Sequence, residues 1–407
     1  MVSIGLSWQG IGPTFGQQRF TIESDPKWRA MAREINGEYR DSKFAVAAQT
    51  RRLAMGYTDW SDLAPAKRPP VRWETNDAKS ADYGHLGQPI SPLPFKFDAK
   101  VLQYYVALNR FDLLEKEKQK YCLFGLRGAA MVRPGSSFVS DLDVKEVYPD
   151  HTTLRCLIGV WDRQSDTIRV FHGSTVPNAD HMARQAFEAA CYNQSNRTCP
   201  VPPSVANMKP PGLYRYVVGT HQGEQSKLPN AFVDAAECFV RRSYDDLIFT
   251  VDDWGVRPEI VGDNLHCAYY DINPDGVDGV IFFSSAGCQT VAGAFYQGEH
   301  NREWAELIAA VGRPGDKTEF DYLLLSGREA RLISESSGNA RYKRLRFGSS
   351  GDPVDTLRKS LNLPSDKKKL FDAQTAKALV DWQRKLTPPA PYGLLDLPQA
   401  KRLGITL

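Results

Sequence analysis

The chain has 407 residues, a net charge of only +3 and a hydrophobic fraction of 42%. These values predict two or three globular domains with real cores, and they exclude a polycation. The charge is uneven, because residues 341–407 hold fourteen Lys and Arg against six Asp, a net charge of +8. A basic segment of this kind suits an anionic polymer, but a solvated surface explains it equally well.

The sequence carries no sign of a membrane span. No apolar run approaches the roughly 18 residues that a span needs. The opening stretch, MVSIGLSWQGIGPTFG, has neither a basic leader nor a continuous apolar segment, so we expect no recognisable signal peptide in this chain. Seven cysteines occur without any CxxC pair, which argues against zinc. We therefore expect no metal and no cofactor.

Residues 1–95 form the first region in chain order. Asp25-Pro26 is typical of a helix start, and a second helix is predicted over 42–55. A Pro-rich irregular stretch follows. We expect an α-rich, irregular N-terminal region of unknown role.

Short β segments dominate the region that follows. A helix is predicted to begin near Asp98, and after it the pattern changes to alternating apolar runs. The predicted strands are CLIGVW (156–161), TIRVFHGST (167–175), GLYRYVVGT (212–220), CFVRRS (238–243), LIFTVD (247–252), GVIFFSS (279–285) and DYLLLS (321–326). Two helices interrupt them, one near 180–192 and one at 301–311. Many short strands with few helices predict a mainly β domain over 96–333, either a sandwich or a part-closed barrel.

The pattern of residues 340–407 again predicts helices. Asp352-Pro353 and Asp372 are predicted caps of two helices, and a third runs from Pro398 to Leu403 before Gly404. A polar SESSGN stretch at 334–339 precedes them. This pattern predicts a small all-α three-helix C-terminal domain over 340–407.

This C-terminal segment resembles the peptidoglycan-binding domain family. The matching stretches are YKRLRFGSSGDPVDTLRKSLNL, LFDAQTAKALVDWQRKL and YGLLDLPQAKRLGI. The positions that match the family pattern are Gly348, Gly351, Asp352, Val354, Phe371, Thr375, Trp382 and Gln383. The run Lys367-Lys368-Lys369 departs from it. The resemblance implies peptidoglycan as a partner, and a three-helix bundle with some other partner is the alternative.

The preceding domain resembles the L,D-transpeptidase catalytic family. That family carries a His on one strand and then Ser/Thr-x-Gly-Cys; here GDNLHCAYY supplies His266, and SSAGCQT supplies Ser285, Gly287 and Cys288. Ala286 stands where a His is frequent, and Gln289-Thr290 replaces the usual pair after the thiol, so the chain looks like a divergent branch. The resemblance implies a β-sandwich with helices, and acyl transfer on stem peptides.

The residues themselves suggest nucleophilic chemistry at Cys288. Small residues before the thiol give a substrate access to the sulfur. An imidazole that takes the proton of a thiol makes it nucleophilic, and His266 is the candidate base. Strand alternation places His266 and Asn264 on one face and Cys267 on the other, so we expect Cys267 to pack in the core. Backbone N–H groups at Gly287 and Cys288 are the candidate oxyanion donors.

Four further residues are candidates for the same site. His221, in VVGTHQGE, either lines a substrate groove or lies on a surface loop. Tyr216 either contacts substrate or packs within its strand. Ser285 either holds His266 or only forms the turn. Asn264 is included with His221 and Tyr216 as a substrate-binding candidate.

Together these observations predict a cysteine enzyme that acts on peptidoglycan stem peptides through a thioester. Hydrolysis, as an L,D-carboxypeptidase or endopeptidase, and L,D-transpeptidation both remain open. A secreted or periplasmic site of action would suit an antibacterial effector or a lysis protein, with an immunity protein or a secretion-system component as possible partners. The alternatives are a catalytically inactive cell-wall-binding protein and a cysteine peptidase for ordinary proteins. We expect no nucleic-acid partner.

Overall fold

A computed structural model describes residues 73–133, 137–179, 181–182, 206–222, 227–242, 248–255, 257–270 and 283–407. The helices expected over 1–72 lie outside these ranges and stay a prediction; the described part of the N-terminal region, residues 73–93, contains turns but no helix. Within the described ranges, no helix combines the length and the apolar character needed to cross a membrane.

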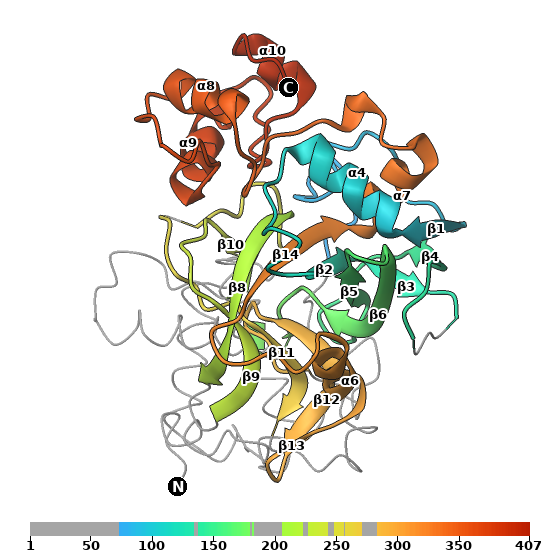
Figure 1. The fold of residues 1–407 in the computed structure, drawn as a ribbon. Coiled ribbons are helices and arrows are strands. Elements are labelled where there is room, and N and C mark those ends of the chain that lie inside the picture. The colour runs from blue at the N-terminus through green and yellow to red at the C-terminus, as the bar shows by residue number, and fades with distance from the viewer. Residues whose placement is uncertain are drawn as a thin grey trace, which may run out of the picture.

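The centre of the molecule is a closed barrel of eight strands (Figure 1). Neighbouring strands follow the order β11-β9-β8-β14-β2-β5-β6-β12, and a parallel pairing of β11 with β12 closes the ring. The strands are β2 (Tyr121–Arg127), β5 (Cys156–Asp162), β6 (Thr167–Ser174), β8 (Gly212–Gln222), β9 (Lys227–Asp234), β11 (Leu265–Tyr270), β12 (Gln289–Tyr296) and β14 (Glu319–Ser326). The expected β-sandwich is therefore wrong. Closure gives every strand of the ring two neighbours, and a short ninth strand, β13 (Glu299–His300), extends the sheet from β12 as its edge.

The barrel interior is filled by one apolar cluster to which all eight strands contribute. Strand alternation decides which residues enter it: on β2, Leu123 belongs to this inner cluster, whereas its neighbours Cys122 and Phe124 belong to a second cluster on the outside. Helix α6 (Arg302–Ala310) adds Trp304, which is fully buried and meets Phe232 edge to face at a centroid distance of 6.0 Å.

Two helices and a small sheet cover the outer cluster. Helix α4 (Ala99–Asn109) begins as predicted, with the Asp98 side chain accepting a hydrogen bond from the backbone of Val101. Helix α7 (Gly327–Ser336) lies beside α4. The small sheet has the order β1-β4-β3, from β1 (Pro94–Asp98), β4 (Asp141–Glu146) and β3 (Ala129–Met131).

A two-stranded ribbon lies in the long connections near one end of the barrel. Strands β7 (Asn207–Met208) and β10 (Arg241–Arg242) pair antiparallel, which places Asn207 opposite Arg242. The predicted strand at 238–243 is thus reduced to two residues, and the described part of 247–252 forms no strand. By contrast, the hairpin of β5 with β6 is confirmed, as is strand β14.

Three helices follow near the C-terminus: α8 (Asp352–Ser360), α9 (Ala373–Gln383) and α10 (Leu397–Arg402). They do not form the expected separate all-α domain. Their apolar core includes Phe239 and Trp254, which belong to the connection between β9 and β11. The indole of Trp254 donates a hydrogen bond to the carbonyl of Pro391, over 2.6 Å.

A buried ion pair also joins this segment to the barrel. Arg346 contacts Glu329 of α7 through two nitrogen–oxygen distances of 2.6 and 3.0 Å, and both side chains are nearly inaccessible to solvent. The amphipathic helices therefore bury their apolar faces partly against residues far away in the sequence. Helix periodicity alone does not identify that partner.

Candidate functional site

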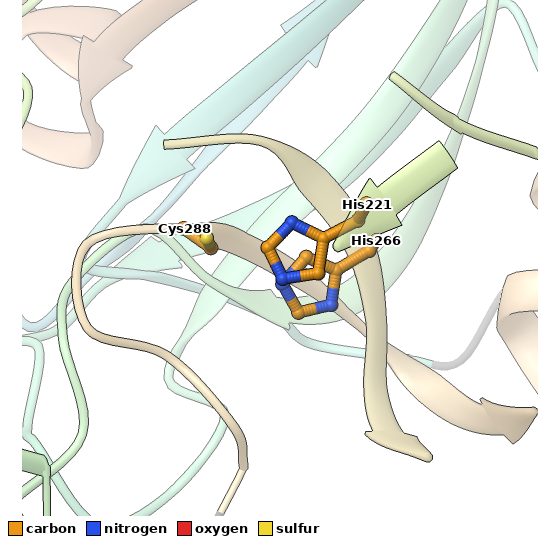
Figure 2. A group of neighbouring side chains, drawn as sticks. All are labelled: His221, His266 and Cys288. Atoms are coloured by element: carbon orange, nitrogen blue, oxygen red, sulfur yellow. The ribbon is translucent and has the colours of Figure 1, made fainter. Parts of the chain in front are cut away.

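The parallel pairing of β11 with β12 brings the candidate nucleophile to the candidate base. Leu265 pairs with Gln289 and His266 with Thr290, so Cys288, just before β12, lies beside the start of β11. One ring nitrogen of His266, one of His221 and the sulfur of Cys288 all lie within 4.8 Å of one another. Figure 2 shows the two imidazole rings one over the other, with Cys288 at their side. The strand next to Cys288 is β12, which begins at Gln289 and therefore follows the thiol in the chain.

His266 is oriented by the main chain. Its Nδ1 lies 2.7 Å from the carbonyl oxygen of Cys267, and only a donating N–H can make that contact. The proton of the neutral ring is therefore on Nδ1, and Nε2 carries a lone pair that can accept a proton. The ring is 1% exposed, and burial lowers the pKa of His266 to about 3. Cys267 itself points into the barrel interior, as strand alternation predicted.

Cys288 is a buried thiol with an 8% exposed surface. Burial raises its pKa to about 12, and the nearby Asp263 carboxyl adds to the shift. A thiolate–imidazolium pair is therefore disfavoured at rest. Both groups are neutral at rest, and the thiol donates to the carbonyl of Gly262 over 3.7 Å, so the thiol has to turn to His266, and proton transfer would have to accompany attack on a substrate.

His221, near the end of β8, holds the opposite tautomer. Its Nδ1 lies 2.7 Å from Nδ2 of Asn264. The orientation of the Asn264 amide is fixed, because its Oδ1 accepts a hydrogen bond of 2.8 Å from the backbone N–H of Asp234. Nδ2 therefore donates to His221, Nδ1 accepts, and the proton of the neutral ring is on Nε2. Burial lowers the pKa of His221 as well, which keeps this ring neutral.

The turn before Cys288 is closed by Ser285 and Gly287. The Ser285 hydroxyl donates to the carbonyl of Cys288 over 2.8 Å and accepts from the backbone N–H of Gly287 over 3.2 Å. Gly287 has a φ of +148°, and a Cβ added there would collide with the Asp263 carboxyl. Glycine is thus required by backbone conformation and by space. The Gly287 N–H is occupied by the hydroxyl rather than directed at a substrate.

These groups line a cleft of about 300 Å³. Its walls include His221, His266, Cys288, Ser285, Asp263 and Arg242. Sequence reasoning missed the last two. Arg242 donates from Nε to Oδ1 of Asn207 over 2.8 Å and forms an ion pair with Glu259 at 2.7 Å. The same Asn207 donates from Nδ2 to Oδ1 of Asp263 over 3.3 Å, so one amide holds both charged groups.

Asp263 places a carboxyl with a raised pKa in the cleft wall. It is 3% exposed, and burial raises its pKa to about 7, although Lys209 and the Asn207 hydrogen bond oppose the shift. Its second carboxyl oxygen, Oδ2, is buried without a hydrogen-bond partner. A buried carboxyl with a displaced pKa beside a thiol is typical of functional sites. The GDN stretch, which ends two residues before His266, was the sequence signal that could have identified it.

Lys209 and Tyr216 support the site from inside the barrel. The Lys209 ammonium forms an ion pair with Asp234 at 3.0 Å and donates to the Asp263 carbonyl at 3.1 Å. The Tyr216 hydroxyl donates to the same carbonyl at 2.8 Å. Tyr216 is fully buried, so it positions the Asp263 backbone and does not form part of the cleft wall. Asn264 is likewise outside the cleft wall, and it positions His221 through its hydrogen bond to Nδ1.

The group His221, His266 and Cys288 has the composition of a metal site with an open position. A metal-bound histidine must present a lone pair to the ion. His221 has its lone pair on Nδ1, where Asn264 donates to it. Turning the Asn264 amide would make Nδ1 the donor and leave the lone pair on Nε2, but it would deprive the Asp234 N–H of its acceptor. The hydrogen-bond network therefore disfavours His221 as a metal ligand, because its Nε2 carries the proton and its Nδ1 already accepts from Asn264.

We compared the chain with protein-family models, with curated proteins and with solved structures, and none of them matches it.

Proposed function

We propose that this chain is a cysteine-dependent enzyme that transfers acyl groups through a thioester on Cys288. The observation that carries the proposal is the placement of a buried thiol within 4.8 Å of two imidazole nitrogens on the wall of a cleft. A nucleophile and a base in one cleft, with the base oriented by a third group, form the minimal arrangement for acyl transfer. Here the third group is the Cys267 carbonyl.

The chemistry follows from the two tautomers. The Cys288 sulfur attacks an amide carbon, and its proton passes to Nε2 of His266. The carbonyl π electrons move to oxygen, which becomes the oxyanion. When the oxyanion collapses, the C–N bond breaks and the leaving amine takes the proton from His266. A thioester remains on Cys288, and water or a second amine resolves it.

We propose peptidoglycan stem peptides as the substrate class. The support is the Ser285-x-Gly287-Cys288 sequence together with a histidine on the neighbouring strand, the pattern that resembles the L,D-transpeptidase family. Resolution by water gives an L,D-carboxypeptidase or endopeptidase, and resolution by a second stem gives a transpeptidase. This substrate implies action in the periplasm or outside the cell, where an antibacterial effector or a lysis protein works and an immunity protein would oppose it.

Mass spectrometry of stem peptides tests the proposal. Purified peptidoglycan is incubated with the wild type, with Cys288→Ala and with Cys267→Ala as the matched control, and the soluble peptides are compared. We expect loss of a terminal D-alanine, a cut cross-link or a new cross-link with the wild type and with Cys267→Ala only. Unchanged peptides with retained binding to the wall would refute the enzyme and leave a cell-wall-binding protein. Cleavage of ordinary L-peptides instead would indicate a protein peptidase.

A further inference from the structure

Acyl transfer through Cys288 requires a hydrogen-bond donor for the negative charge that develops on the substrate oxygen. The turn before the thiol is the usual place to look for one. Here the Gly287 N–H is 3.2 Å from the Ser285 hydroxyl and is bonded to it. The Asn207 amide is also engaged, because it donates to Asp263. The Cys288 N–H is the other candidate of this turn, and a second donor beside it has to come from another part of the cleft wall.

His221 presents such a donor. The Asp234 N–H fixes the Asn264 amide, and the Asn264 amide fixes Nδ1 of His221 as an acceptor. The proton is left on Nε2, at the opposite side of the ring from Asn264. The ring lies in the cleft wall and stacks on His266 with a centroid distance of 4.4 Å and an angle of 21°. In near-parallel stacking, an N–H in the ring plane points past the other ring and not at its nitrogens.

We propose that the two stacked histidines divide the chemistry: His266 accepts the thiol proton, and His221 donates an Nε2–H hydrogen bond to the oxyanion. The inference rests on the proposed acyl transfer for its reaction, but not on the identity of the acyl donor. No proton leaves His221 in this step. Its N–H only stabilises the charge on oxygen, while the proton of the thiol goes to His266 and then to the leaving group. Asn264 is the positioning residue that sets the tautomer.

Two measurements test this division of roles. The first is ¹⁵N NMR of the full chain labelled at histidine, with the His221 signals identified by their loss in His221→Gln. We expect the Nε2–H tautomer for His221 and the Nδ1–H tautomer for His266. In Asn264→Asp, a carboxylate faces Nδ1, and the His221 tautomer should reverse. A wild-type His221 with its proton on Nδ1 would overturn the inference.

The second measurement is acylation of Cys288 by p-nitrophenyl acetate, followed as p-nitrophenol release and as added mass on the protein. His221→Phe keeps a ring that can stack but removes the donor, so the rate should fall by about 100-fold or more, as for other lost oxyanion donors. His221→Gln retains an N–H of similar reach and should stay within about 10-fold of the wild type. Asn264→Asp should fall with His221→Phe. His172→Gln, on β6 and outside the cleft, is the control and should leave the rate unchanged.

A rate for His221→Phe within about 3-fold of the wild type would overturn the inference, as would a wild type that is not acylated at Cys288. The acetate ester separates this question from the substrate. If Cys288 is acylated with the expected dependence on His221 while peptidoglycan stays intact, the substrate proposal fails and the division of roles stands.

Discussion

Replacement of Asp263 by asparagine should stabilise the protein at high pH and much less at low pH. The Asp263 carboxyl is buried, and its pKa is raised to about 7. An unfolded aspartate titrates near 3.9, so between these two values the unfolded chain is ionised while the folded chain holds the proton. The folded state binds more protons in that range, and its stability falls as the pH rises from about 4 to about 7.

The size of the effect follows from the shift. A displacement of about 3 units corresponds to a cost of about 4 kcal/mol once the pH exceeds 7, at about 1.4 kcal/mol for each unit. At pH 5 the cost is only about 1–2 kcal/mol, because pH 5 lies only about one unit above the pKa of the unfolded carboxyl. Asparagine has nearly the same shape and can still accept from Asn207, but it does not ionise. The difference in stability between Asp263→Asn and the wild type should therefore grow by about 2–3 kcal/mol from pH 5 to pH 8.

Urea unfolding at pH 5, 6, 7 and 8 measures this difference directly. Asp141→Asn is the control: Asp141 is solvent-exposed, and the adjacent Lys96 lowers its pKa, so its contribution to stability does not change between pH 5 and pH 8. A difference for Asp263→Asn that is independent of pH, or that shrinks as the pH rises, would refute the assignment of a buried neutral carboxyl beside Cys288.

Three other substitutions or treatments test separate features. Because burial raises the pKa of Cys288 to about 12, its alkylation by iodoacetamide, followed by peptide mass spectrometry, should still accelerate up to pH of about 10; a plateau near neutral pH would show a thiolate at rest. Gly287→Ala should lose roughly 1–3 kcal/mol or more in urea unfolding and exceed the loss for Gly298→Ala, which also has a positive φ but has open space around it; equal losses would contradict the predicted collision. Glu329→Gln leaves Arg346 buried without its charge partner and should cost about 3–5 kcal/mol, and an unchanged midpoint would show that this pair does not hold the C-terminal segment.

Several of the local elements could be predicted from the residue pattern alone. Residue alternation predicted β5, β6 and β14, because each strand packs one face on the inner cluster and the other on the outer cluster. Capping chemistry predicted the start of α4 at Asp98 and of α9 at Asp372, where side chains accept from the first turn of each helix. The small residues before Cys288 and the position of His266 on a strand also identified the pair that the structure brings together.

The closure of the barrel and the packing of the C-terminal helices depend on contacts between segments that are distant in the sequence. The pairing of β11 with β12 turns the sheet into a barrel, and that choice depends on strands whose neighbours are not adjacent in sequence. The C-terminal helices would be amphipathic in a separate domain as well as in the observed packing. The sequence pattern therefore does not show that their apolar faces pack against Phe239 and Trp254.

The chemistry of the cleft was decided in the same way. The sequence does not say which ring nitrogen of a histidine carries the proton. In His221 this is set by the hydrogen bond from Asn264, whose amide is held by the backbone N–H of Asp234. The pKa of Asp263 is ordinary in the unfolded chain, and it is raised when folding buries the carboxyl away from water. Hydrogen-bond direction and desolvation are properties of the packed environment. They arise only when segments far apart in the chain are brought into contact.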